Sequence, residues 1–206
     1  MRWESRALVL LLTSAATLGV DAAELPGSAR AAAALARCAE ADQARGSARA
    51  DLLKKGVALA EEAIAADDTD ARAHFALFCN LGKQTKDAGS SVFNLGKLPR
   101  LRHEVDRTLE LVPDSTDALY GKGALLRATP RLMGGDPAEA ERLLRRAVEI
   151  DPAFFSARLE LARALADRHA VDEARAEATR ALETARQRGD AGDAKEAEAF
   201  LAGLAR

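Results

Sequence analysis

The sequence has few of the residues that build sheets, disulfide frameworks or thiolate metal sites. It contains two cysteines, eight valines, two isoleucines and 4% aromatic residues, against 48 alanines. Alanine loses no side-chain entropy in a helix, whereas strands draw on β-branched and aromatic residues. Two cysteines are too few for a disulfide-dense scaffold or a four-thiolate zinc site. The composition therefore predicts an all-α protein, and we expect neither a metal nor a cofactor.

An excess of positive charge is also absent. The 206 residues include 30 Lys and Arg against 32 Asp and Glu, which gives a formal net charge of −2. Sustained binding to nucleic acid depends on an excess of basic side chains that neutralise phosphates. We therefore expect no nucleic-acid partner, although the chain is long enough to bury a substantial core.

The first 22 residues have the pattern of a secretory signal. Arg2 and Arg6 precede the uncharged residues 7–20, and small residues stand at Val20 and Ala22. A helix of 14 residues is roughly 21 Å long, which is short of the ~30 Å hydrocarbon core of a bilayer. We therefore predict cleavage after Ala22 and a single exported, periplasmic domain of residues 23–206. The alternatives are an N-terminal core helix and an uncleaved anchor.

No later run approaches 18 consecutive apolar residues, so no transmembrane segment is expected after the signal is removed. No cysteine lies near the predicted cleavage site, so we do not expect a lipid-anchored terminus.

The remaining chain repeats a helical pattern. Four windows begin at Gly56, Leu101, Ala140 and Ala174, and each has small or apolar residues at offsets of four and seven. These offsets place three side chains on one helical face, as a packed helix requires. Three of the windows follow a partner helix with a matching stripe. The structural repeat positions are Gly123, Ala140, Ala147, Pro152, Ala162, Ala174 and Ala181.

The window starts lie 45, 39 and 34 residues apart. The last interval equals the tetratricopeptide period, and over roughly residues 30–185 the chain resembles the tetratricopeptide repeat family. This resemblance implies an all-α solenoid of about four helical hairpins. We also predict a C-terminal capping helix at 194–204, and insertions near 82–97 and 128–136 that lengthen two turns.

A narrower resemblance covers about residues 72–182. The long turn before the helix GKLPRLRHEVDRTLELVPD and the later turn PRLMGGDP are similar to the T-component of tripartite ATP-independent periplasmic transporters. The resemblance implies an exported accessory subunit that associates with a periplasmic substrate-binding protein and takes an apolar ligand through a central pore. The chain departs from lipid-anchored members of that family because it has no lipobox cysteine.

Catalytic motifs are absent from the sequence. His74, His103 and His169 are scattered, and no HExxH, GxGxxG, GxxxxGK or GxSxG string occurs. His103 and Asp106 lie one turn apart, but ordinary surface positions explain them better than a shared metal. We therefore expect a non-catalytic protein; the remaining enzyme hypothesis would need an unrecognised site around His74 or His103.

The two insertions supply the candidate contacts for a partner. The first is basic, contains glycine and has an apolar centre, which suits an acidic partner or an anionic ligand. The alternative is a solvated loop whose Phe93 covers the core edge. The candidate binding residues are Lys83, Lys86, Phe93, Lys97, Arg100, Leu132 and Met133.

Two functions follow as hypotheses. The first is a protein-binding module, including the transporter-accessory role, with oligomers allowed. The second is a carrier for a small apolar ligand in a channel lined by Phe75, Phe78, Phe93, Leu132 and Met133.

Cys38 and Cys79 fall on the first helices of adjacent hairpins. In an exported compartment they either pair in a disulfide or remain two small buried apolar residues.

Overall fold

The structure is a computed structural model that describes residues 25–89 and 96–204. The predicted signal peptide and the candidate Phe93 lie outside these residues. The helices are α1 (Ala29–Gln43), α2 (Gly46–Ala66), α3 (Ala71–Asp87), α5 (Leu98–Leu111), α6 (Thr116–Ala128), α7 (Pro137–Ile150), α8 (Phe155–Asp167), α9 (Val171–Arg188) and α10 (Ala191–Leu204), with a short 3-10 turn at Arg131–Met133.

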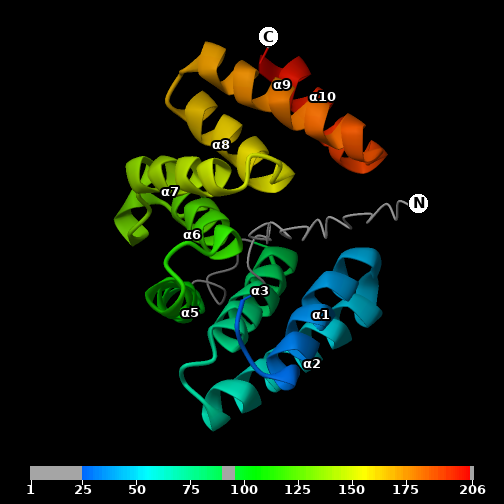
Figure 1. The fold of residues 1–206 in the computed structure, drawn as a ribbon, viewed down its shortest axis with the longest axis vertical. Coiled ribbons are helices and arrows are strands. Elements are labelled where there is room, and N and C mark those ends of the chain that lie inside the picture. Colours follow the sequence, from blue (N-terminus) through cyan, green and yellow to red (C-terminus); the bar gives the residue numbers. More distant parts are fainter. Residues whose placement is uncertain (1–24, 90–95, 205–206) are drawn as a thin grey trace, which may run out of the picture.

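The helices form a stack of hairpins. The pairs α1–α2, α3–α5, α6–α7 and α8–α9 follow one another from one end of the molecule to the other, and α10 packs on α8 and α9 (Figure 1). No strand occurs among the described residues. The prediction of an all-α solenoid of four hairpins with a terminal helix is therefore confirmed.

Alanine and glycine allow the helices to pack closely. Ala140 and Ala147 on α7 and Ala162 on α8 are fully buried, as are Ala174 and Ala181 on α9. Gly123 on α6 has no room for a side chain, because a Cβ there would lie 2.7 Å from Leu144 of α7. Small side chains at these positions let neighbouring helices approach to the close end of their usual separation.

Side-chain caps determine where several helices begin. The Asp136 carboxylate accepts hydrogen bonds from the backbone N–H groups of Ala138 and Glu139, and Pro137 occupies the first turn of α7. Ser115 caps α6 in the same way through Ala118 N–H. Each cap satisfies backbone donors that have no partner within the helix.

The first insertion is shorter than predicted, because Gly82–Asp87 continues α3. Contacts with the preceding hairpin favour this extension. Lys83 forms an ion pair of 2.6 Å with Asp42 of α1, and Asp87 pairs with Arg49 of α2 at the same distance. The connection between helices therefore begins at Ala88.

The terminal helix begins earlier than predicted, at Ala191 instead of residue 194. The Asp190 carboxylate accepts hydrogen bonds from Gly192 and Asp193 N–H, which starts the helix directly after the left-handed Gly189. The connection between α9 and α10 is therefore a turn of two residues, Gly189 and Asp190. Within the described part of the chain, no helix combines the length and apolar character needed to cross a membrane.

Candidate functional site

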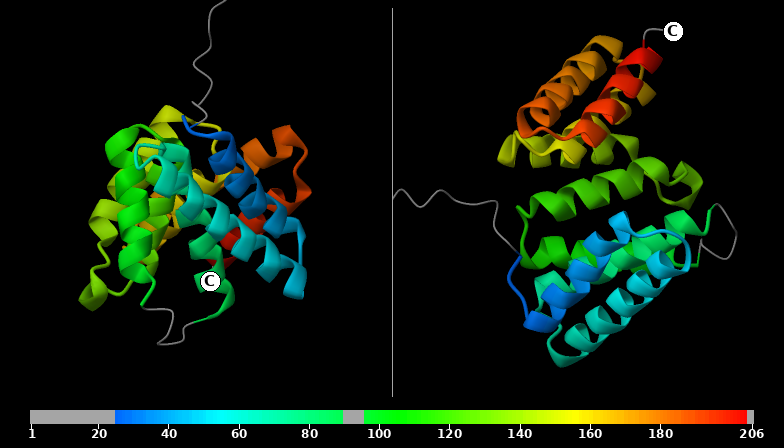
Figure 2. Two further views of the ribbon diagram at one scale, coloured as in Figure 1. Left: turned by 90° about the horizontal axis from the view of Figure 1, so that it is seen from below. Right: turned by 90° about the vertical axis from the view of Figure 1, so that its right-hand side faces the viewer.

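The α6–α7 connection lies on the same side of the stack as the end of α3 and the start of α5, next to them in both views of Figure 2. These three segments hold the predicted contact residues that the structure describes. In the second connection the chain turns tightly, because Met133 N–H donates to Pro130 O at 2.8 Å and Gly134 N–H donates to Arg131 O at 2.9 Å. Gly134 has a φ of +85°, which favours glycine. A Cβ on Gly135 would lie 1.8 Å from the Thr129 carbonyl oxygen. Gly134 therefore allows the left-handed backbone of the turn, and Gly135 allows the close approach to Thr129.

Arg102 of α5 ties this turn to the preceding hairpin. Its Nη2 donates to the carbonyl oxygen of Met133 at 2.5 Å, and its guanidinium lies against Gly134. In the sequence Arg102 belongs to a basic run, and no local signal distinguishes it from its neighbours. The contact is between residues 31 positions apart, so only the packing of α5 beside α6 reveals it.

Leu132 is displayed at the tip of this turn. Its side chain is as exposed as in an extended peptide, at 103%, whereas Met133 is half-buried. Among the described residues the other exposed large apolar side chain is Val171, at 38%. Of the two apolar residues predicted in this insertion, Leu132 is the one offered to solvent.

The basic candidates divide into two groups. Lys83 and Arg100 serve the fold: Lys83 Nζ donates to the Cys38 carbonyl at 2.9 Å and pairs with Asp42, and Arg100 pairs with the buried Glu104 at 2.6 Å. Lys86 is exposed, and Lys97 contacts the neutral Gln84 at 3.3 Å. Lys86 and Lys97 therefore remain at the surface beside the first connection.

Two of the aromatic residues predicted to line a channel, Phe75 and Phe78, belong to the core. Phe75 is buried with Val105 and Ala118, and Phe78 packs against Phe75 with 6.1 Å between ring centroids. Leu132 is fully exposed and lies in another connection. The structure therefore buries Phe75 and Phe78 together and leaves Leu132 in solvent, so these three side chains do not line a common channel.

Two cysteines that the sequence left unassigned form a disulfide. Cys38 of α1 and Cys79 of α3 are bonded, with their Cα atoms 6.2 Å apart. The bond joins the first and second hairpins.

His74 of α3 is hydrogen-bonded to a buried carboxyl group. Its Nδ1 lies 2.6 Å from Glu104 Oε2 of α5, and its Nε2 lies 3.0 Å from the Asp68 carbonyl oxygen. Both side chains of the pair are almost completely buried. In the sequence His74 is a scattered histidine, because Glu104 is 30 residues away and no short motif connects them.

His103 and Asp106 do not share a site. His103 is exposed, while Asp106 pairs with Lys122 of α6 at 2.7 Å. No group of three metal-ligating side chains is found within residues 25–89 and 96–204.

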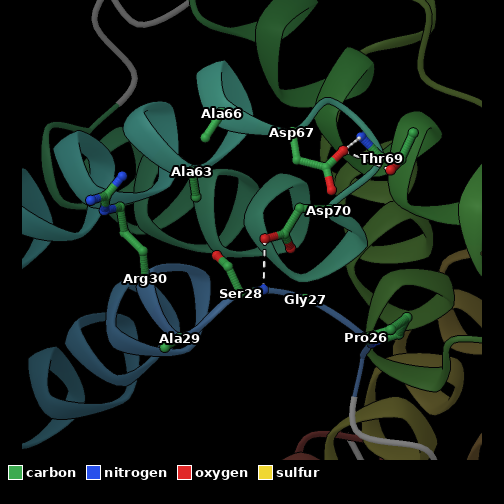
Figure 3. Close-up of a pocket in the computed structure, with 10 residues that line it drawn as sticks. All are labelled: Pro26, Gly27, Ser28, Ala29, Arg30, Ala63, Ala66, Asp67, Thr69 and Asp70. Carbon is green, nitrogen blue, oxygen red and sulfur yellow. Dashed lines mark hydrogen bonds between the residues drawn. The ribbon is translucent and has the colours of Figure 1, made fainter.

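A hollow of about 630 Å³ lies where the segment before α1 meets the α2–α3 turn (Figure 3). Its polar groups are used by the backbone: Asp70 accepts from Ser28 N–H and Ala73 N–H, both at 2.8 Å, and Asp67 accepts from Thr69. Leu25, just before this segment, is buried in the core with Phe75. The hollow is therefore a junction between the N-terminal segment and the second hairpin.

Ion pairs cross the face made by the first helices of the last two hairpins and α10. Arg127 of α6 pairs with Glu160 of α8 at 2.7 Å, Arg163 pairs with the same Glu160, and Arg163 reaches Glu196 of α10 at 2.6 Å. The charges on this face are matched to one another.

Comparisons with known proteins agree with this architecture. Residues 131–197 match the family model described as Tetratricopeptide repeat. No curated protein sequence matches the chain.

Three solved structures have a similar fold at 17% sequence identity. TTC0263, a thermophilic TPR protein in Thermus thermophilus, has a TM-score of 0.58 over 76% of this chain and 74% of its own. PilW, a widely conserved type IV pilus biogenesis factor, has a TM-score of 0.56 over 86% and 79%. MamA from Desulfovibrio magneticus RS-1 has a TM-score of 0.52 over 88% and 98%.

At this identity the structural likeness concerns the fold alone, and the sequence match covers only the short 3-10 turn, α7, α8, α9 and the start of α10. The chain thus has the fold of a tetratricopeptide repeat solenoid, and its residues 131–197 match that family.

Proposed function

We propose that this protein is an exported, non-catalytic module that binds another protein, and that its partner is a periplasmic substrate-binding protein of a transporter. A tetratricopeptide-type solenoid is an interaction fold, because each hairpin adds surface to a continuous face without requiring a catalytic pocket. The observation that carries the proposal is the exposed Leu132 on the α6–α7 turn. This turn lies beside the end of α3, which carries Lys86, and the start of α5, which carries Lys97.

The resemblance of residues 72–182 to the transporter T-component supports the choice of partner. The signal-like residues 1–22 support export, since a substrate-binding protein of this kind would be met outside the cytoplasm. On the face of α6, α8 and α10, the ion pairs join neighbouring helices, so these charges stabilise the stack. This supports the α6–α7 turn and its neighbours as the contact region for a partner.

The test uses the full chain with a C-terminal tag, produced in its native cell. We expect the tagged protein in the periplasmic fraction, with Ala23 at its N-terminus, and a substrate-binding protein recovered with it in comparable molar amount after brief cross-linking. An unrelated exported protein with the same tag is the control.

Recovery of the tagged protein in the cytosol, or with no substrate-binding protein above the control, would contradict the proposal. An apolar small molecule extracted in equimolar amount from the purified protein, with no protein partner, would instead favour the carrier function.

A further inference from the structure

The turn that carries Leu132 is rigid although its leucine is exposed. Backbone hydrogen bonds close the turn at Met133 and Gly134, and a third joins Gly135 N–H to Pro130 O at 3.0 Å. Arg102 adds a bond from the neighbouring hairpin. A side chain presented on an ordered turn loses little conformational entropy when it binds, so Leu132 is preorganised as an apolar contact.

The cations around this turn differ from most arginines of α7, α8 and α9. Between residues 142 and 186, a stretch that the structure describes throughout, every arginine forms an ion pair with a carboxylate. At the two connections, Lys86, Lys97, Arg102 and Arg131 form no ion pair with any described carboxylate. Asp136, the acid next to the turn, has its carboxylate engaged as the cap of α7.

We propose that a docking surface for an acidic protein segment with an apolar side chain is formed by Leu132, Met133, Arg102 and Arg131, together with Lys86 at the end of α3 and Lys97 at the start of α5. We call this the Leu132 surface. Unmatched positive charge around an exposed leucine complements carboxylates that flank an apolar residue. The proposal rests on the proposed function and specifies the chemistry of the partner's contact segment.

A protein segment fits the Leu132 surface better than a lipid bilayer. The Arg102 guanidinium is held against the turn by the Met133 carbonyl, and a planar guanidinium at a fixed position suits carboxylate pairing. A bilayer would instead require a broader apolar area, because insertion of few methylene groups gives only weak, reversible attachment. Leu132 is the single fully exposed large apolar side chain among the described residues.

The test measures binding of a fluorescein-labelled peptide of glutamates and leucines, spaced by glycines, to the purified full chain by fluorescence anisotropy. The control peptide replaces every glutamate with glutamine. Leu132→Ser and the double variant Lys86→Gln/Arg131→Gln should each weaken binding by at least about tenfold.

Each variant has a matched control of the same chemistry. Val171→Ser removes the other exposed large apolar side chain, and Lys54→Gln/Lys55→Gln removes two exposed cations on α2 that have no ion pair with a described carboxylate. We expect both controls to change binding by no more than about twofold, since Val171 lies on α9 and the two lysines lie on α2, outside the elements that form the Leu132 surface. All four variants change surface positions, so folding is expected to be preserved and is checked by circular dichroism.

Equal weakening by the test and control variants, equal binding of the glutamine peptide, or no saturable binding would overturn the proposal. Preferential, Leu132-dependent binding to phosphatidylglycerol vesicles would also overturn it, in favour of a membrane contact. Failure of the peptide test while a substrate-binding protein is still captured would place that contact elsewhere on the solenoid. Peptide binding without such capture would support the Leu132 surface and contradict only the identity of the partner.

Discussion

At the scale of single residues, the buried His74 is hydrogen-bonded to Glu104, and its surroundings change its pKa. Burial opposes the charged imidazole, but the hydrogen bond to Glu104, the bond to the Asp68 carbonyl and the charges of both carboxylates outweigh burial. The pKa of His74 is therefore raised above its ordinary value of 6.5. Arg100 pairs with the second oxygen of Glu104, and Arg107 pairs with Asp68, so the histidine lies in a network of alternating charge.

This pair predicts a pH-dependent stability. Because the folded-state pKa of His74 is raised, its contribution is fully present below the unfolded value of about pH 6.5 and is lost as pH rises through the folded value. We expect the free energy of unfolding, measured by urea denaturation, to fall as the pH rises from about 6.5 through the raised pKa of His74. His74→Asn should lose that pH dependence, whereas His103→Asn, at an exposed position on α5, should retain it. Parallel pH profiles for the native chain and His74→Asn would contradict the prediction.

At the scale of elements, the first two hairpins are held together by more than apolar packing. Asn80 of α3 is fully buried, and its amide donates to the carbonyl of Ala34 in α1 at 3.0 Å. Gly56 of α2 makes room for Asn80, since a Cβ there would lie 2.1 Å from its side-chain oxygen. The Cys38–Cys79 disulfide adds a covalent link between α1 and α3, with a sequence separation of 41 residues.

The disulfide should contribute to the stability of this part of the stack. Removing a cross-link that closes a loop of this length costs about 2–4 kcal/mol, because the unfolded chain regains conformational freedom. We expect Cys38→Ser/Cys79→Ser to lower the free energy of unfolding by this amount, and hydrogen exchange to increase first in α1 and α2. A reducing agent should produce a similar loss in the native chain and none in the double variant. An unchanged melting temperature on full reduction would refute the prediction.

At the scale of the whole molecule, a solenoid must cover the apolar face of its last repeat. α10 does so: Ala197 is fully buried against the cluster that contains Phe155 and Leu159 of α8, and Phe200 and Leu201 pack beside it. Arg163 and Arg186 pair with Glu196 and Glu198 of α10 and orient the helix. Without such a cap the end of the stack would expose apolar surface.

The capping role predicts a contrast between two positions on α10. Ala197→Asp places an unpaired carboxylate in the buried contact and should destabilise the chain by roughly 3 kcal/mol or more, with increased binding of a dye specific for apolar surface. Ala199→Asp, at an exposed position on the same helix, should change stability by no more than about 0.5 kcal/mol. Thermal melts of the two variants that shift equally would contradict a capping role for α10.

Much of the architecture followed from local patterns. The stripes at offsets of four and seven identified the helices that form the hairpins, because helix periodicity depends on residues close in the chain. The same reasoning placed the end of α3 before residue 82, whereas the helix continues to Asp87. Lys83 and Asp87 extend α3 through ion pairs with Asp42 and Arg49, and those partners lie about 40 positions away.

The candidate site was predicted only in part. Sequence composition pointed to the two insertions and to Leu132, since a basic, glycine-containing segment is recognisable without packing. It could not separate Lys83 and Arg100, which serve the fold, from Lys86 and Lys97, which remain at the surface. The export signal and the transporter-accessory role stay predictions.

Local sequence was enough to establish that the chain is helical, that its helices form hairpins and that the hairpins stack, because each of these properties comes from residues within one or two turns of one another. Which charges are matched between different hairpins depends on the packing of the hairpins and could not be read from the chain. That packing joins Cys38 to Cys79, buries His74 against Glu104, and sets Arg102 against the turn of Leu132. These contacts join residues 30 or more positions apart, and their partners are chosen by how one hairpin packs on the next.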